Sequence, residues 1–344
     1  MLPGVLHYRL GPFLLASEIP LPELEPLAAG VSPNAISTAV NSTAGTDVVS
    51  IRLGDVPENI ANVVANESRW WASRHEYLLH VPKVANFLVR HGREVLVRPA
   101  TGAHPADIRA YLLSPIFSTL CHQAGMYSLH ASAVRIGAGV VAFLGNSGAG
   151  KSTLAAGLAQ RGYELVSDDI CLLDTRYRVE TPAHGPVLVV PVAPALKLWR
   201  SALDHFGASP EALPRVFSRD HKYRIVIPQP PELPQRLPLR EVLFLEWANQ
   251  DSEDRASTQP IRASQPAKPS IFTPVVGVQA VARLMEFTHY DYLMKPTGRQ
   301  SGNFLLCGQI LSQARAFALS RPRSFSHLDR TLDALELHLA TLKD

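Results

Sequence analysis

The sequence predicts an α/β protein of two domains, and three features of the chain lead to this prediction. Short β-branched and leucine-rich runs dominate residues 1–100. An apolar strand, a glycine-rich loop, a helix and a second strand follow one another over residues 140–169, which is the order of an α/β unit. Helical patterns dominate from about residue 275. We therefore expect a smaller β-rich N-terminal domain over residues 1–100 and an α/β domain over residues 101–344 with a helical C-terminus.

Four runs in the N-terminal domain have the composition of β-strands, which favour β-branched and large apolar residues. They are VVSIRLG (48–54), EYLLHV (76–81), NFLVR (86–90) and EVLVRP (94–99). His91-Gly92 lies between the last two runs and predicts a hairpin. The small and polar segment 28–47 predicts a flexible loop.

Residues 105–124 predict a helix that links the two domains. Pro105 suits a first helical turn, and Gly125 suits a C-terminal cap. Pro115 lies inside this helix and should kink or split it, because proline removes one backbone donor and clashes with the preceding turn.

The remaining elements follow from apolar runs and their breakers. We expect strands at 128–134, 140–145, 163–169, 170–174, 185–190, 222–228 and 240–247. We expect helices at 151–162 and 194–207, each ended by a glycine, and further helices from about 275, the last at 326–342. Residues 249–269 predict an exposed loop.

The composition excludes several classes of protein. The formal net charge of +3 includes no basic run, so a nucleic-acid partner is not expected. The longest apolar stretch, residues 185–196, is too short to cross a membrane and contains two prolines. The first residues lack the pattern of a signal peptide. The three cysteines have no CxxC spacing, which predicts reduced thiols in a cytoplasmic protein without a zinc site.

Residues 145–152 fit the phosphate-loop pattern G-x-x-x-x-G-K-[ST] between a predicted strand and a predicted helix. Glycines let consecutive backbone N–H groups point at phosphates, and the helix adds the positive end of its dipole. Lys151 supplies a charge for the β- and γ-phosphates, and the Ser152 hydroxyl can bind Mg²⁺. We therefore expect ATP and Mg²⁺ to be held by Gly145, Asn146, Ser147, Gly148, Ala149, Gly150, Lys151, Ser152 and Thr153.

Three further residues flank this loop. Asp168 and Asp169 lie 17 and 18 residues after Lys151, at the end of the next predicted strand. Adjacent side chains on a strand point to opposite sides, so one carboxylate can lie by Mg²⁺ while the other faces an incoming hydroxyl. His130 lies 21 residues before Lys151, on a strand expected to pair with 140–145 and to bring the imidazole near the phosphates. The other interpretations are that Asp168 and Asp169 only cap a loop and that His130 has a structural role.

The order of these elements resembles the catalytic core of HPr kinase/phosphorylase. That family carries a His, then G-x-S-G-x-G-K-S, then R-G-H-x-L-V-A-D-D, and this chain has His130, G-N-S-G-A-G-K-S (145–152) and R-G-Y-E-L-V-S-D-D (161–169). The close match covers about 45 residues. The family is related in its core to the ATP-dependent phosphoenolpyruvate carboxykinases, so the resemblance implies a P-loop kinase core of this type.

The resemblance also implies roles for the matched residues. Asp168 corresponds to a general base toward the serine hydroxyl of a small protein, Asp169 lies near the metal together with Ser152, and His130 lies by the transferred phosphate. Family members assemble as oligomers, which implies a homo-oligomer here. The family's downstream E-I-R-G-L-G signature is absent from this chain, so the reverse dephosphorylation is not implied.

Over more of its length the chain is similar to HPr-kinase-like proteins encoded with lasso peptide biosynthesis genes. IPLPELEPL (19–27), LHASAV (129–134) and LKLW (196–199) add to the motifs above in this resemblance. Its members phosphorylate the side chain of the C-terminal residue of a precursor peptide, which implies that class of substrate.

Lys197, Lys222 and Arg224 are candidate clamps for a phosphate or a carboxylate. Lys222 and Arg224 alternate on a predicted strand and so share one face, although a solvated face is the other interpretation.

The leading hypothesis is an ATP- and Mg²⁺-dependent kinase acting on a serine hydroxyl of a peptide or small protein, with Asp168, His130 and Lys151 as catalytic residues. The alternatives are a nucleotide-dependent peptide-binding scaffold without phosphoryl transfer and a carboxykinase-like enzyme acting on a small molecule. A transporter ATPase is not favoured, because no LSGGQ-like signature follows GAGKSTL.

Overall fold

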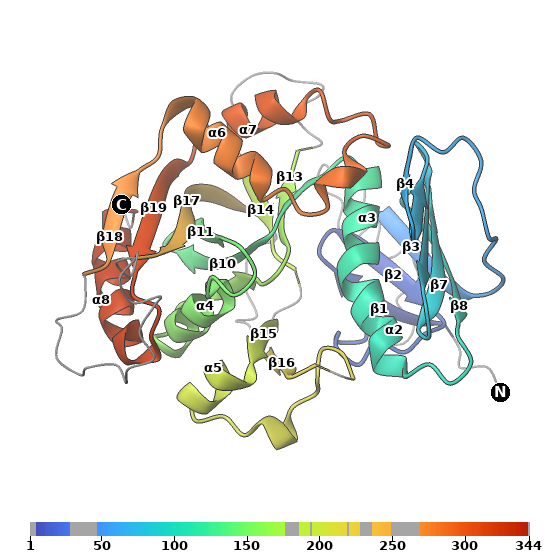
Figure 1. Ribbon diagram of the computed structural model, residues 1–344, viewed down its shortest axis with the longest axis horizontal. Helices are drawn as coiled ribbons and strands as arrows, with labels where there is room; N and C mark the ends of the chain where they lie inside the picture. Colours follow the sequence, from blue (N-terminus) through green and yellow to red (C-terminus); the bar gives the residue numbers. More distant parts are fainter. Residues whose placement is uncertain are drawn as a thin grey trace, which may run out of the picture.

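The chain forms a mixed α/β structure with two main sheets and a small two-stranded sheet between them (Figure 1). The computed structural model describes residues 5–27, 47–175, 186–192, 195–218, 220–227, 236–248 and 269–342. The loops predicted at 28–47 and 249–269 lie almost wholly outside these described residues.

The first sheet is built from the N-terminal residues and has the strand order β1-β2-β3-β8-β7-β6-β5-β4. The four strands and the hairpin predicted here are confirmed, and His91 and Gly92 turn that hairpin with positive φ. The strands are β1 (Leu6–Leu10), β2 (Phe13–Ser17), β3 (Asp47–Leu53), β4 (Ala65–Glu67), β5 (Trp70–Ala72), β6 (Glu76–Val81), β7 (Ala85–Arg90) and β8 (Glu94–Pro99).

The predicted linking helix covers one face of this sheet. It consists of α2 (Pro105–Tyr111), η1 (Leu112–Ile116) and α3 (Phe117–Gln123), and the π-helical η1 contains Pro115, where the split was expected. Phe117 packs edge-on against Phe13 of the sheet, with ring centroids 6.0 Å apart. The linking helix and the N-terminal sheet therefore share one apolar core.

The second sheet carries the predicted central unit, and its strands run in the order β12-β10-β11-β17-β14-β13-β9, with β19 joining β17 to β18. In β11, Val140, Ala142 and Leu144 enter one core, whereas Val141 and Phe143 enter the other. Burial of both faces explains the uninterrupted apolar run. The strands are β9 (Tyr127–Leu129), β10 (Ala131–Ile136), β11 (Gly139–Leu144), β12 (Leu165–Ser167), β13 (Cys171–Asp174), β14 (Leu188–Val190), β17 (Leu237–Trp247), β18 (Ile271–Pro274) and β19 (Arg315–Arg321).

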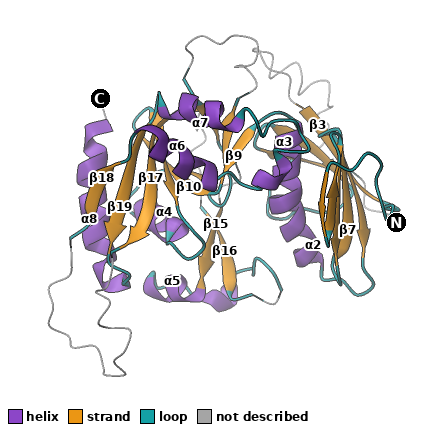
Figure 2. Cartoon of the chain, turned by 45° about the horizontal axis from the view of Figure 1, so that its top comes forward, coloured by secondary structure: helices purple, strands orange, loops and turns teal. Residues whose placement is uncertain are grey.

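Helices cover both faces of the second sheet (Figures 1 and 2). One face packs against α4 (Lys151–Gln160) and α8 (Leu328–Leu339), and the other against α6 (Gly277–Glu286) and α7 (Asn303–Leu311). At the crossing of α4 and α8, a Cβ on Gly157 would lie 2.6 Å from Leu332, so a glycine permits this close approach. Within the described part of the chain, no helix is both long enough and apolar enough to span a bilayer.

The helix predicted at 194–207 is wrong over its first half. The chain there forms β15 (Ala195–Trp199), which pairs antiparallel with β16 (Lys222–Val226), and only α5 (Arg200–His205) is helical. Leu196 and Leu198 alternate into the core, and the partner strand satisfies the backbone. Tertiary pairing therefore overrides a segment whose local pattern also fits a helix. Figure 2 shows this small sheet between the two larger halves of the molecule.

The C-terminal region is also less helical than the sequence predicts. α6, α7 and α8 are present, but β18 and β19 separate them and extend the second sheet. β19 reads RAFALSR, which lacks a strong β signal, yet it lies between β17 and β18 and is ordered by pairing on both sides.

We expect the buried carboxylate of Glu241 to stabilise this end of the sheet. Its Oε2 accepts hydrogen bonds from Arg315 at 2.6 and 2.8 Å, and its Oε1 lies 2.8 Å from His338 Nε2. Glu241→Gln should lower the free energy of unfolding in urea by about 1–3 kcal/mol, the usual cost of losing charged hydrogen bonds.

Glu246→Gln on the same strand is the matched control. Glu246 pairs with Arg283 at an exposed position, so its change should be within about 0.5 kcal/mol. Equal effects of the two substitutions would contradict the stabilising role of Glu241.

Candidate active site

The glycine-rich loop joins the end of β11 to the start of α4. Gly148 and Gly150 have φ values of 81° and 82°, in the left-handed region that favours glycine. A Cβ on Gly150 would also lie 2.7 Å from Nη2 of Arg321. The local sequence therefore forms the strand, loop and helix arrangement that presents backbone N–H groups to an anion.

Lys151 is the first residue of α4, and its ammonium group lies inside the loop. Its Nζ donates to the carbonyl oxygen of Gly145 at 2.6 Å and lies 3.1 Å from Nε2 of His130. Burial lowers the pKa of Lys151 to about 8, although Asp168 and Asp169 favour its charged form. The lysine is therefore a buried cation whose charge depends on nearby anions.

Asp168 follows β12 and faces the start of α4. Its Oδ1 accepts hydrogen bonds from the hydroxyls of Ser152 at 2.8 Å and Ser132 at 2.5 Å. Its Oδ2 accepts the backbone N–H of Lys197 at 2.8 Å. The Asp168 carboxylate thus lies beside the hydroxyl that the motif identifies as a metal ligand.

Asp169 faces away from Ser152, toward the linking helix and β15. Its Oδ2 accepts from Nζ of Lys197 at 2.6 Å and from Oγ of Ser114 at 3.3 Å. Burial alone would raise the pKa of Asp169, but Lys197 together with His289 and His130 outweighs burial and holds this pKa well below its usual range. Its φ of 73° lies in the left-handed region, which is uncommon for a residue with a side chain.

His130 connects Lys151 to Asp169. Its Nδ1 lies 3.1 Å from the Asp169 carbonyl oxygen and 3.3 Å from Oδ1, whereas its Nε2 faces the Lys151 ammonium group. Burial and the nearby Lys151 lower the pKa of His130, so the imidazole is neutral at pH 7. Its neighbours then favour the proton on Nδ1 and a lone pair on Nε2.

His289 is a member of the site that the sequence did not reveal. Its ring stacks on that of His130 with centroids 5.4 Å apart, and its Nδ1 lies 2.7 Å from Oγ of Ser118. Burial lowers the pKa of His289 to about 3. No motif surrounds this histidine in the sequence, so only the fold brings it to the site.

Two places in the site offer groups that could bind a metal. His130, Asp169 and His289 present three such atoms within 4.8 Å of one another. However, the ammonium groups of Lys151 and Lys197 already contact this cluster, and they disfavour a divalent cation there. The paired oxygens of Ser152 and Asp168 suit Mg²⁺ better, because Mg²⁺ prefers oxygen ligands.

The loop, Lys151 and Asp169 line a cleft of about 550 Å³. Trp247, Arg321 and Phe325 form much of its other wall. Arg321 stacks on Trp247, with its guanidinium carbon 4.1 Å from the ring centroid, and donates to the carbonyl oxygen of Ala149. Trp247 ends β17, which is parallel to β11, and such strand ends often border a ligand, so the sequence could have indicated this residue. Arg321 ends β19, a strand that the sequence did not predict, so nothing in the sequence indicated it.

The three candidate clamps are distributed over two cavities. Lys197 and Arg224 are directly opposed in the β15–β16 pair. Lys222 lines the cleft beside the glycine-rich loop, Arg224 lines a second cavity, and Lys197 lines both. The shared strand face of Lys222 and Arg224 therefore spans two sites.

No family model matches the chain, and no curated protein matches its sequence. Among solved structures, the chain is similar to the HPr(Ser) kinase/phosphatase from Coxiella burnetii, with 13% identity and a TM-score of 0.31. The similarity covers 63% of this chain and 92% of that chain. At this identity and TM-score the likeness supports no conclusion about this chain, whose chemistry depends on the residues of the site and their contacts.

The Lys197–Asp169 pair should contribute to stability in a pH-dependent way. Lys197→Met leaves Asp169 without its ammonium partner and should lower the free energy of unfolding at pH 7 by about 1–3 kcal/mol. Because the folded-state pKa of Asp169 is depressed, its contribution is present above the unfolded value of 3.8 and is lost as the pH falls below it.

The difference in unfolding free energy between the native protein and Lys197→Met should therefore shrink when urea unfolding is measured below about pH 4. Lys295→Met removes an exposed lysine and serves as the control. A difference that stays constant down to pH 3 would contradict the ion-pair origin of the effect.

Proposed function

We propose that this protein is an ATP- and Mg²⁺-dependent kinase that transfers a phosphoryl group to a serine hydroxyl. The observation that carries the proposal is that two carboxylates near Lys151 have different side-chain partners. Asp168 accepts the Ser152 hydroxyl at the glycine-rich loop, whereas Asp169 accepts the Lys197 ammonium group and the Ser114 hydroxyl. Phosphoryl transfer needs one group by the metal and another by the attacking hydroxyl.

The loop supplies the nucleotide side of the reaction. Its backbone N–H groups and Lys151 would hold the β- and γ-phosphates, with Arg321 behind the loop at Ala149. Ser152 and Asp168 would hold Mg²⁺, which neutralises charge on the phosphates when bound. Trp247 and Phe325 leave an aromatic wall in the same cleft for the remainder of the nucleotide.

Asp169 supplies the acceptor side. The serine oxygen forms a bond to the γ-phosphorus, the bond from that phosphorus to the β–γ bridging oxygen breaks, and ADP leaves with the electron pair. The serine proton passes to the Asp169 carboxylate and then to solvent. Because its pKa is low, Asp169 accepts this proton only late, after the hydroxyl has become acidic, which suits a loose transition state.

His130 has a positioning role in this arrangement. As a neutral ring it accepts from Lys151 and donates toward Asp169, so it fixes the distance between the cation at the phosphates and the carboxylate at the hydroxyl. His289 stacks behind it and limits its rotation.

These roles reverse the assignment that the family resemblance implies. That resemblance gave the base role to Asp168 and the metal role to Asp169. The contacts of this chain favour Asp168 as a metal ligand, because the Ser152 hydroxyl is its neighbour. They favour Asp169 as the partner of the acceptor hydroxyl, because it faces away from Ser152 and already accepts the hydroxyl of Ser114.

The acceptor is proposed from the sequence resemblance. LHASAV, the phosphate loop and LKLW resemble kinases that act on lasso peptide precursors, so we propose a precursor peptide phosphorylated at its C-terminal residue. A homo-oligomer remains a prediction of the resemblance to HPr kinase/phosphorylase. A nucleotide-dependent peptide-binding scaffold is the alternative, and the transfer assay below distinguishes the two.

The first test is mass spectrometry of serine-containing peptides after incubation with ATP and Mg²⁺. We expect a gain of one phosphate with the native protein, and a loss of at least about 100-fold in rate with Asp169→Asn, which keeps ATP binding. Asp168→Asn should instead raise the Mg²⁺ concentration needed for activity.

Nucleotide binding without transfer to any peptide would favour the scaffold. A fully active Asp169→Asn variant beside an Asp168→Asn variant that stays inactive at every Mg²⁺ concentration would restore the original assignment of the two carboxylates.

The second test uses the lowered pKa of Lys151. As the pH rises through 8, the free protein loses this charge, whereas bound phosphates should restore it. ATP binding should therefore take up close to one proton between pH 8 and the ordinary lysine value of 10.5, and affinity should fall as the pH rises.

Titration calorimetry in buffers of different ionisation enthalpy measures this proton uptake. Lys151→Arg keeps a permanent charge and should bind ATP without the uptake. Lys151→Ala should bind ATP weakly at every pH. Equal proton uptake in all three proteins would show that Lys151 does not contact the phosphates.

A further inference from the structure

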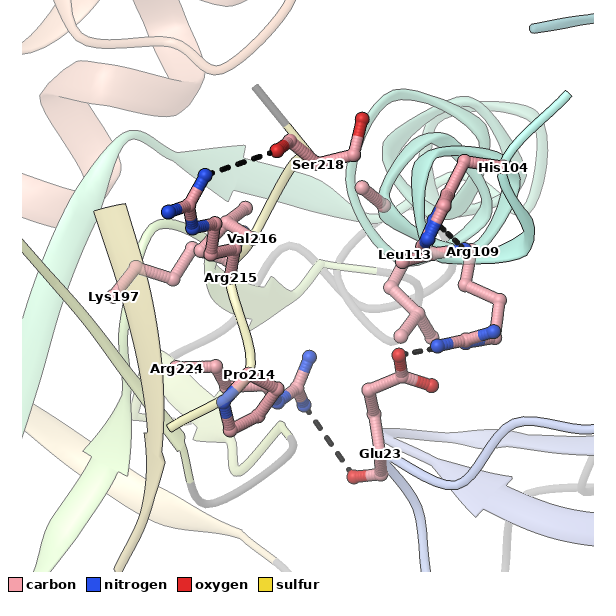
Figure 3. Close-up of a pocket in the computed structure, with 12 residues that line it drawn as sticks. Glu23, His104, Arg109, Leu113, Lys197, Pro214, Arg215, Val216, Ser218 and Arg224 are labelled. Atoms are coloured by element: carbon pink, nitrogen blue, oxygen red, sulfur yellow. Dashed lines mark hydrogen bonds and ion pairs between the residues drawn. The ribbon is translucent and has the colours of Figure 1, made fainter. Parts of the chain in front are cut away.

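A second cavity of about 380 Å³ lies where the two halves of the molecule meet. Figure 3 shows its walls: Glu23 comes from the N-terminal sheet side, Arg109 from α2, and Lys197 and Arg224 from the β15–β16 pair. Because the walls come from three separate parts of the chain, the cavity exists only in the assembled fold.

Cationic side chains dominate this cavity. Lys197, Arg109, Arg215 and Arg224 line it, whereas Glu23 is the sole acidic residue among the described lining residues. Glu23 Oε1 is already bonded to Nε of Arg109 at 2.7 Å. The cavity therefore has an excess of positive charge available to an anionic ligand.

Two buried atoms in the cavity lack a hydrogen-bond partner within the described structure. Nε of Arg224 is an unused donor, and Oε2 of Glu23 is an unused acceptor. The other contact of Arg224 is weak, because its Nη2 reaches the Glu23 carbonyl oxygen only at 3.4 Å (Figure 3). Buried polar atoms are normally paired, so these two indicate a ligand that offers both an acceptor and a donor.

The cavity adjoins the acceptor side of the candidate active site through a shared wall residue. Lys197 lines both cavities, and its ammonium group bonds to Asp169 at 2.6 Å. Leu113 lines the second cavity, and the adjacent Ser114 also contacts Asp169. A group bound at Arg224 would therefore lie one lysine side chain away from the carboxylate that faces the reacting hydroxyl.

We propose that this cavity is an acceptor subsite that binds a carboxylate of the phosphorylated substrate, with Arg224 as its main partner. The proposal rests on the proposed kinase function and names the chemistry of its acceptor: a hydroxyl and a nearby carboxylate on one chain. Lys197 lies between the two groups, where it contacts Asp169 and faces the bound carboxylate.

A peptide carboxylate fits the two unpaired atoms better than a free phosphate does. Its oxygens accept from the Arg224 guanidinium, and an amide N–H of the same peptide can donate to Oε2 of Glu23. Free phosphate retains an O–H donor near neutral pH, but it brings up to two negative charges beside the Glu23 carboxylate, whereas a peptide carboxylate brings one and can place it away from Glu23. The carboxylate could be the C-terminus of the peptide or an acidic side chain near the serine, and the experiment distinguishes them.

The test compares three synthetic peptides that differ only in the carboxylate. One ends in serine with a free C-terminal carboxylate, the second is its C-terminal amide, and the third is the amide with a glutamate two residues before the serine. Calorimetry in the presence of Mg²⁺ and a non-hydrolysable ATP analogue measures binding without transfer. We expect one of the two acidic peptides to bind at least about 10-fold more tightly than the neutral amide.

The tighter acidic peptide identifies the source of the carboxylate. Arg224→Gln should remove the preference and leave the binding of the ATP analogue unchanged, and Arg224→Lys should restore part of it. Arg330→Gln, an exposed arginine on α8, is the matched control and should retain the preference.

Three results would overturn the subsite. These are equal affinity of the native protein for all three peptides, no binding of any peptide at millimolar concentration, or a preference that persists in a folded Arg224→Gln protein. The peptide comparison uses the native protein, so it decides even where a variant fails to fold. A preference for carboxylate without phosphoryl transfer to any peptide would support the subsite while contradicting the proposed kinase function.

Discussion

The ion pair between Lys197 and Asp169 is the interaction on which the arrangement of the site depends. Asp169 lies just after the short strand β12 and itself has a left-handed backbone conformation. Nζ of Lys197 donates to its Oδ2 at 2.6 Å. The backbone N–H of the same lysine binds Asp168. One residue of the small β15–β16 sheet therefore fixes both carboxylates at the edge of the second sheet.

Lys197 also lines both cavities. The β15–β16 pair lies between the larger halves of the molecule, and its residues face the phosphate-loop cleft on one side and the cationic cavity on the other. Arg109 of the linking helix donates to Glu23, and this contact closes one side of the second cavity. The N-terminal residues thus form part of the wall of the second cavity, although the glycine-rich loop is built without them.

Charge balance explains why the buried groups tolerate one another. Lys151 and Lys197 lie within hydrogen-bond distance of His130 and Asp169, and this leaves the His130 ring neutral while Asp169 stays ionised. A second carboxylate, Asp168, faces the hydroxyls of Ser132 and Ser152. The network separates one acidic group suited to a metal from another suited to a hydroxyl, and a separation of this kind is what an in-line transfer requires.

The sequence by itself determined the parts of the site that depend on local order. The apolar strand, the glycines, Lys151 and Ser152 are contiguous. Asp168 directly follows β12 and His130 lies between β9 and β10, so their approach follows from the strands of the α/β unit. Other residues have no local signature, and their positions in the site depend on contacts between distant segments. β19 and β15 form because neighbouring strands satisfy their backbone, which brings Arg321 to the loop and turns Lys197 toward Asp169. His289 and Glu23 reach their places through packing between distant segments, and a linear pattern contains no record of such contacts.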